Sequence, residues 1–327
     1  MSELVVTGLG ITCPGVAKPS DAAAPRQEPS PGWFDVSCAL PGRGYKRLPA
    51  ACQYLLAAAR NALADADAPF DGVPDERRGL VVATNNAAME LTEHQDGVIL
   101  ASSADEIGPL TAPFFVLSLF ASRLATEHGV RGFCLTANSP RTAGLQALRL
   151  AGRALACGRA DLLLVGVTEE RLPESEPGSS HSDCGAAVLV CGPAASTAAE
   201  TAYGDCRIGD VFLEPGGEPD PALTRAWNVV CAGAPGPVLV DAVLDDSAIG
   251  GAVASWLARR PVETRMVRAG AGCLTPMRHV VGALAGGGPE RVVITAAAEG
   301  AVTMARVRPA RHAGEQTISH RTMSARS

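Results

Sequence analysis

The densest cluster of side chains that could do chemistry is the run Ser180-His-Ser-Asp-Cys184. A catalytic triad assembles its nucleophile, base and orienting acid from distant segments, so five consecutive residues do not match that geometry. His181 and Cys184 could ligate a metal ion only with two further ligands, and the sequence places none for them. The run therefore predicts a turn before a strand at Gly185, and neither a triad nor a metal centre.

Other patterns point to no cofactor. Gly8-x-Gly10 follows a short apolar run, but a dinucleotide loop would need a third glycine and an acid about 20 residues later. Lysine occurs only at positions 18 and 46, which leaves few candidates for the Schiff base of a pyridoxal phosphate enzyme. The acids at 169–170 and 245–246 are adjacent in sequence, so their side chains diverge and form no glycosidase pair.

Charge and hydropathy exclude further classes. The 327 residues carry a formal net charge of −6, whereas a nucleic-acid binder needs a basic face. No apolar run reaches the roughly 18 residues that span a bilayer, and the N-terminus lacks the features of a signal peptide. The ten cysteines form no C-x-x-C pair and several lie in apolar runs, which indicates a reducing environment. We expect a cytoplasmic protein that binds neither nucleic acid nor membrane.

Alternating strands and helices predict an α/β fold whose sheets are covered on both faces. Apolar runs indicate strands at residues 4–7, 79–84, 131–137, 161–167, 185–191, 238–243, 291–297 and 301–307. Helices are expected at residues 48–66 and 139–156, and a mostly buried one at 113–126. In the second of these, Ser139 is suited to the N-cap and Pro140 to the first helical position.

The chain divides into two similar halves. The strand pairs 161–167/185–191 and 291–297/301–307 each follow a helix and should form antiparallel hairpins, and strands 4–7 and 238–243 are matched as the first of each half. We expect an N-terminal half at 1–192, a C-terminal half at 193–310 and a disordered tail at 311–327.

Several stretches, in order, resemble the ketosynthase branch of the thiolase superfamily. They are Val5–Gly15, Gly44–Leu48 with the following Ala-rich helix, Glu127–Leu148, and Gly270-Ala-Gly-Cys273-Leu-Thr-Pro. The resemblance covers nearly the whole chain and implies a thiolase-like fold, with two similar halves in a layered α-β-α-β-α arrangement. The chain is shorter than is usual for the family.

The chemistry of that family uses a cysteine thiolate at the N-terminus of a buried helix, and two histidines that assist decarboxylation of a malonyl thioester. The resemblance places Asn138 at the position of the nucleophile. The first histidine would lie within residues 242–248, which contain none, and the position of the second histidine is taken by Cys273. A carboxamide cannot form the acyl thioester. Loading ketosynthases that replace the cysteine with Gln keep the histidines, so a residual decarboxylase is not expected. Asn138 can equally serve only as part of a helix cap.

Ketosynthase-like chains without the nucleophile resemble chain length factors of type II polyketide synthases, which pair with a catalytic ketosynthase. The resemblance implies a heterodimer with that subunit through a large apolar interface, and an acyl carrier protein as a transient partner. It also implies that one segment lines the far end of a shared acyl tunnel, although plain core packing would explain the same residues. The candidate tunnel residues are Phe114, Phe115, Ser118, Leu119, Ser122 and Phe133.

Two alternatives stay open. A thioester-handling acyltransferase could use a relocated nucleophile at Cys273 or Cys134, with His279 as a distant candidate base. A homodimeric regulatory pseudo-enzyme would need no partner.

Overall fold

The computed structural model describes residues 3–67, 69–85, 87–108, 112–175, 179–193, 202–214, 217–233 and 238–310. Its strands are β1 Glu3–Thr12, β2 Arg78–Thr84, β3 Cys134–Asn138, β4 Leu162–Glu169, β5 Gly185–Pro193, β6 Gly204–Phe212, β7 Leu239–Leu244, β8 Thr264–Arg268, β9 Arg291–Ala296 and β10 Ala301–Pro309. Its α-helices are α1 Val36–Ala39, α2 Ala50–Asp65, α3 Met89–Ala101, α4 Ser118–His128, α5 Ala143–Ala156, α6 Pro219–Val230, α7 Ala248–Ala258 and α8 Leu274–Gly286.

The strands form one sheet in the order β3-β2-β4-β5-β1-β6-β10-β9-β7-β8. The first five strands in this order and the last five form two sets with the same plan. In each set the three outer strands are parallel: β3, β2 and β4 in one, and β9, β7 and β8 in the other. The two inner strands of each set pair antiparallel with their neighbours. A short antiparallel pairing of Glu3–Val6 with Gly204–Arg207 joins the sets. The predicted hairpins are confirmed as β4–β5 and β9–β10.

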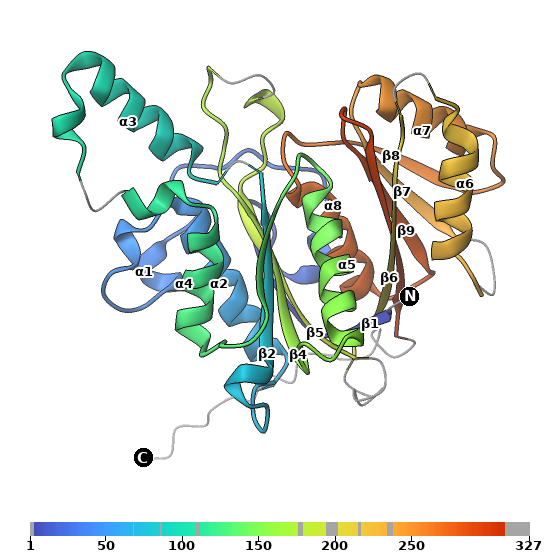
Figure 1. The fold of residues 1–327 in the computed structure, drawn as a ribbon, viewed down its shortest axis with the longest axis horizontal. Coiled ribbons are helices and arrows are strands. Elements are labelled where there is room, and N and C mark those ends of the chain that lie inside the picture. The colour runs from blue at the N-terminus through green and yellow to red at the C-terminus, as the bar shows by residue number, and fades with distance from the viewer. Residues whose placement is uncertain are drawn as a thin grey trace, which may run out of the picture.

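Helices cover both sets of strands and also separate them, which gives the layered thiolase-like arrangement (Figure 1). One core lies between α2, α4 and the N-terminal strands, and another lies between the C-terminal strands, α6 and α7. The third and central core surrounds α5 and α8 and contacts strands of both sets. The α/β fold with two similar halves is confirmed.

The glycines of β1 allow α2 to pack directly on the strand. A Cβ added at Gly10 would lie 1.9 Å from the carbonyl oxygen of Ala58, and one at Gly8 would lie 2.4 Å from that of Ala62. The Gly-x-Gly pattern therefore serves a helix–strand contact, in which no side chain fits between the two backbones.

Two expectations about the elements are wrong, and one helix was not predicted. The match of strand 238–243 to strand 4–7 fails, because β6 neighbours β1 and occupies its place in the second set, whereas β7 corresponds to β2. The helix expected at 113–126 is α4, preceded by a 3-10 turn at Ala112–Phe115, and it buries only Phe120, Ala121 and Leu124. Helix α3 was not predicted, because it buries only Gln95 and so lacks an apolar stripe.

The division of the chain into domains at 192/193 stays a prediction. β5 ends at Pro193 and β6 begins at Gly204. The expected tail at 311–327 lies outside the described residues.

Candidate functional site

Three segments that the sequence marked as candidate site positions meet at the N-terminal ends of α5 and α8. The side chain of Arg141, in the loop before α5, reaches both of the other segments. Its Nη1 lies 2.8 Å from Oδ2 of Asp245, which follows β7, and its Nε–H donates to the carbonyl oxygen of Gly270, in the loop before α8, at 3.3 Å. A Cβ at Gly144 would lie 2.7 Å from the carbonyl oxygen of Cys273, so this glycine permits the two helices to approach.

Asn138 is not at the start of the helix. It is the exposed last residue of β3, and α5 begins at Ala143 with Thr142 as its N-cap residue. The expected roles of Ser139 as N-cap and Pro140 as first helical residue are wrong for the same reason, and the hydroxyl of Ser139 instead pairs with that of Thr142 at 2.9 Å. The sequence signal was a plausible cap, but the turn between strand and helix is longer than it implied.

Arg141 is the residue directly before the N-cap of α5, and sequence reasoning missed it. Its φ of 56° is a left-handed conformation that is uncommon for a residue with a side chain. Such strain persists only where surrounding contacts hold it, and the ion pair with Asp245 does so here. Both side chains are about four-fifths buried, with 21% and 17% of their surface exposed. A guanidinium stays protonated and cannot attack a thioester.

Cys273 is fully buried at the N-terminus of α8, against the carboxyl group of Glu169 at the end of β4. Its backbone N–H donates to Oε1 of Glu169. Burial raises the pKa of the Cys273 thiol well above its usual value, and the neighbouring Glu169 raises it further. A protonated, inaccessible thiol is a poor nucleophile. This geometry argues against Cys273 as a relocated nucleophile.

Glu169 is itself unusual. Burial raises its pKa to about 8, although hydrogen bonds from the backbone of Cys273 and Leu274 oppose that effect. Gly272 makes room for it, since a Cβ there would lie 1.7 Å from Oε1 of Glu169. The carboxyl group is therefore enclosed by the turn that starts α8.

His279, the distant candidate base, is engaged elsewhere. Its Nδ1 lies 3.1 Å from Oδ2 of Asp241, whose Oδ1 accepts a hydrogen bond from Nε of Arg265 at 2.8 Å. Burial raises the pKa of Asp241, but hydrogen bonds from His279 and Arg265 outweigh it and lower the pKa to about 2. The other candidate thiol, Cys134, is exposed, and partial burial raises its pKa.

The run at 180–184 forms the turn predicted before a strand. A 3-10 turn at Ser179–His181 precedes β5. The carboxylate of Asp183 accepts from Oγ1 of Thr275 at 2.6 Å and pairs with Arg278, and all three side chains are buried. The cluster anchors α8 to the N-terminal half.

The candidate tunnel residues fall into two groups. Phe114, Phe115, Ser118, Leu119 and Ser122 lie in the 3-10 turn and α4, on the outer side of the N-terminal sheet, where Phe115, Ser118 and Ser122 are exposed. Phe133 instead packs against the central core, whereas α4 packs against the outer one. The structure therefore does not place Phe133 with the other five. Phe114 lines a pocket of about 280 Å³ together with Leu91 and His94 of α3.

In the parts of the chain that the structure describes, none of the helices combines the length and the apolar character that crossing a bilayer requires. Within the same residues, no group of three or more His, Cys, Asp or Glu side chains could hold a metal ion.

Part of the chain is similar in sequence to a known protein family. Residues 37–182 match the family model of the beta-ketoacyl synthase N-terminal domain. A 3-oxoacyl-[acyl-carrier-protein] synthase 2 of Vibrio cholerae is 23% identical over 137 residues, which are 42% of this chain and 33% of the relative.

Solved structures match over a greater length. The ishigamide ketosynthase/chain length factor has a TM-score of 0.74 at 20% identity, covering 94% of this chain and 99% of the other. A second similar structure is that of a type II polyketide synthase acyl-carrier protein in complex with its ketosynthase bound to the hexaketide. Its TM-score is 0.75 at 15% sequence identity, and the match covers 94% of this chain and 100% of the other. A beta-ketoacyl synthase from Burkholderia phymatum has a TM-score of 0.68 at 15% sequence identity, and the match covers 94% of this chain and 100% of the other. The chain therefore has the thiolase-like fold of these ketosynthases, and residues 37–182 are similar in sequence to the beta-ketoacyl synthase N-terminal domain.

Proposed function

We propose that this chain is a non-catalytic ketosynthase-like subunit, a chain length factor, which pairs with an active ketosynthase and shapes the acyl tunnel. The observation that carries the proposal is the Arg141–Asp245 ion pair at the start of α5. On the resemblance, Asn138 stands at the nucleophile position and residues 242–248 hold no histidine, and this ion pair lies beside both segments, where its guanidinium cannot be acylated. Cys273, buried against Glu169, offers no substitute.

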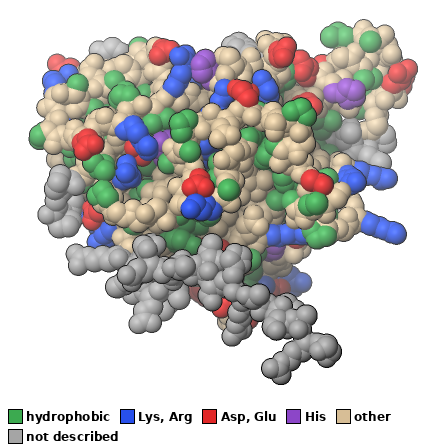
Figure 2. Space-filling view, turned by 180° about the vertical axis from the view of Figure 1, so that it is seen from behind, with side chains coloured by type: hydrophobic (Ala, Val, Ile, Leu, Met, Phe, Trp, Pro, Cys, Tyr) green, Lys and Arg blue, Asp and Glu red, His purple; other side chains and the backbone are tan. Residues whose placement is uncertain are grey.

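The exposed surface of the N-terminal half supports a partner. Helix α3 projects from the body at the end of the molecule that also carries α4 (Figure 1). Seen from behind, this lobe exposes hydrophobic side chains at its tip beside acidic side chains and a histidine (Figure 2). Leu100 is 87% exposed, and Ile99, Phe115 and Val116 are also exposed. Large apolar side chains gathered in one exposed region mark an interaction surface.

An open strand lies at the same end of the sheet. Within the described chain, β3 pairs only with β2, so its other edge carries unpaired backbone groups. An open edge can pair with a strand of another chain. The heterodimer, the transient acyl carrier protein and the location in the cytoplasm are parts of this proposal.

The experiment is native mass spectrometry of this chain, produced alone and together with the ketosynthase encoded beside it. A 1:1 complex is expected. Leu100→Glu should weaken the complex without destabilising the chain, because the side chain is exposed, while Met266→Glu, at the opposite end of the sheet and 56% exposed, should not. A well-behaved homodimer that ignores the ketosynthase would overturn the proposal in favour of a homodimeric pseudo-enzyme.

The tunnel is tested through its products. Phe114→Ala should lengthen the acyl chain made by the complex, since it removes bulk from the pocket next to α3. Phe115→Ala removes the neighbouring ring of the same 3-10 turn and is expected to have the same effect. Phe212→Ala removes another exposed ring, from β6, and serves as the control. Unchanged product length in both variants would count against the tunnel.

A further inference from the structure

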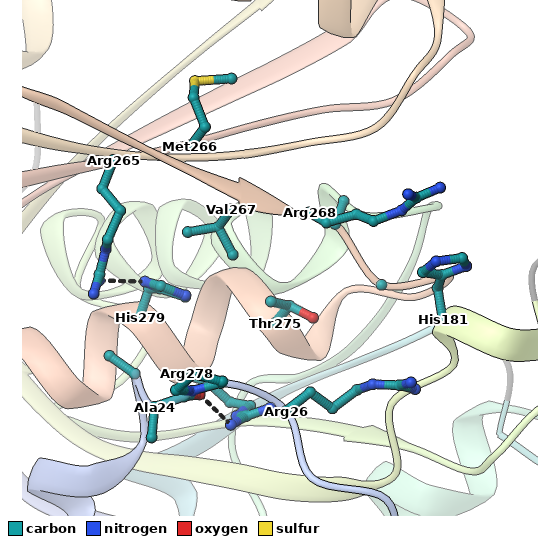
Figure 3. Close-up of a pocket in the computed structure, with 14 residues that line it drawn as sticks. Ala24, Arg26, His181, Arg265, Met266, Val267, Arg268, Thr275, Arg278 and His279 are labelled. Carbon is teal, nitrogen blue, oxygen red and sulfur yellow. Dashed lines mark hydrogen bonds between the residues drawn. The ribbon is translucent and has the colours of Figure 1, made fainter.

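A second pocket, of about 390 Å³, lies between β8, the first turns of α8 and the loop at residues 23–26. Figure 3 shows side chains entering it from all of these elements and from the 3-10 turn before β5. Its ionisable lining residues are all basic or histidine: Arg26, His181, Arg265, Arg268, Arg278 and His279. None of them serves the proposed tunnel.

The acids that pair with Arg265, Arg278 and His279 lie behind the wall of the pocket. Asp183 bonds to Thr275 and Arg278, and Asp241 bonds to Arg265 and His279, but neither carboxylate lines the pocket. A concave surface lined by one sign of charge concentrates ligands of the other sign. The pocket is therefore built to receive an anion.

Three of the basic groups are available at one end. The side chains of Arg26, His181 and Arg268 extend toward the same end of the pocket from three separate segments (Figure 3). The partner acids of the two arginines are exposed, since Glu28 and Asp246 keep 57% and 87% of their side-chain surface. Such exposed ion pairs contribute little stability, so a ligand can displace these carboxylates at low cost.

Arg26 is also held in position before any ligand arrives. Its guanidinium donates to the backbone carbonyl oxygens of Ser180 and Ser182. Because a guanidinium has five N–H donors, some remain for an anion. Fixing the donor in advance reduces the entropy that binding would cost.

We propose that this pocket binds a small organic anion, whose carboxylate or phosphate group lies among Arg26, His181 and Arg268. Its volume falls in the range of sites for small organic molecules. The apolar part of the ligand lies against Val267, Ala269 and the loop at 23–25, which line the remainder. Arginine suits such a ligand because its planar fork matches both oxyanions. Binding is non-covalent and concerns this chain alone, so it does not depend on the proposed heterodimer or tunnel.

The ligand would also touch the segment that fixes the Arg141 ion pair. Gly270 lines the pocket and accepts a hydrogen bond from Arg141, and the ion-pair partner of Arg268, Asp246, is adjacent to Asp245. An anion that draws the side chain of Arg268 away from Asp246 would therefore move a residue only two positions before Gly270, whose carbonyl oxygen accepts the hydrogen bond from Arg141.

The test is isothermal titration calorimetry of the full chain with inorganic phosphate, phenyl phosphate and succinate, at constant ionic strength in chloride. We expect saturable 1:1 binding of at least one organic probe. Arg268→Ala and Arg26→Gln should each weaken it about tenfold or more, as expected for loss of a charge-assisted hydrogen bond. Arg259→Ala should not change it, since Arg259 is a similarly exposed arginine paired with the exposed Asp220 on the outer helices.

The arms of the experiment separate the possible ligands. A preference for phenyl phosphate identifies a phosphorylated ligand, and a preference for succinate a carboxylate. Binding that is unsaturable, or that is equally strong in Arg268→Ala, Arg26→Gln and Arg259→Ala, overturns the proposal as a general effect of anions. Circular dichroism of each variant establishes that it is folded, so that lost binding reports on the pocket.

Discussion

The two central helices, α5 and α8, start at corresponding places in the two halves, yet the groups at their N-termini differ in kind. Before α5, Arg141 is paired with Asp245 and both side chains keep some exposure. At the start of α8, Cys273 and Glu169 are buried together, and the pKa of each is raised. The N-terminus of α5 thus lies beside an ion pair, whereas that of α8 lies beside buried groups whose raised pKa values favour their uncharged forms.

The largest expected effect is the pH dependence caused by Glu169. Because its pKa is about 8 in the folded chain and 4.5 when exposed, the unfolded chain ionises first as pH rises. The protonated form of Glu169 therefore supports stability fully below pH 4.5, and this support is lost between about pH 4.5 and 8, by about 5 kcal/mol in full. Glu169→Gln should flatten this part of the curve in urea unfolding measured at each pH.

The control for that experiment is Glu263→Gln, which changes an exposed side chain. An identical pH profile for wild type and Glu169→Gln would show that the acid at α8 does not remain protonated.

The next effect tests how tightly Glu169 is enclosed. Gly272→Ala would place a methyl group against the carboxyl carbon and both oxygens of Glu169, so we expect a loss of about 3 kcal/mol in the free energy of unfolding. Gly251→Ala lies on an open face of α7 and should be neutral or slightly stabilising. Equal melting temperatures for the two variants would contradict the tight packing at α8.

The smallest effect concerns the ion pair at α5. A double-mutant cycle of Arg141→Ala and Asp245→Asn should give a coupling of about 1 kcal/mol in the free energy of unfolding, measured with urea. The reason is that water only partly screens the attraction between the two charges. Arg149 and Asp210 form a more exposed pair at 2.6 Å and should give a smaller coupling. A coupling at α5 no larger than that one would mean that the pair does not hold the strained turn.

Sequence reasoning succeeded where burial leaves a pattern. The runs at 161–167 and 185–191 are continuously apolar because β4 and β5 are covered on both faces, and they were placed to within two residues. Sequence reasoning failed where packing leaves no apolar pattern in the sequence. Helix α3 has no buried apolar stripe, and strand β6 mixes Asp205, Arg207 and Asp210 with its buried residues. The missed β6 is what misaligned the two halves.

At the site, the sequence identified the segments that meet but not the contacts between them. Ser139-Pro140 is a normal start for a helix, but α5 begins only at Ala143. The turn at Arg141 has a positive φ, and arginine gives no sequence signal for that conformation. The pairing of Glu169 with Cys273 joins residues 104 apart, which no local pattern reveals.

The position of β1 in the middle of the sheet has a consequence during synthesis. This strand ends at Thr12, but its neighbours β5 and β6 begin only at Gly185 and Gly204. At 5–20 residues per second, the ribosome needs roughly 10 to 40 s to supply them after β1 has emerged. For that time the nascent chain carries an apolar strand without partners, and contacts so distant in sequence also slow folding itself. Exposed strand of this kind is a target for chaperones in the cell, and the yield of folded chain should depend on them.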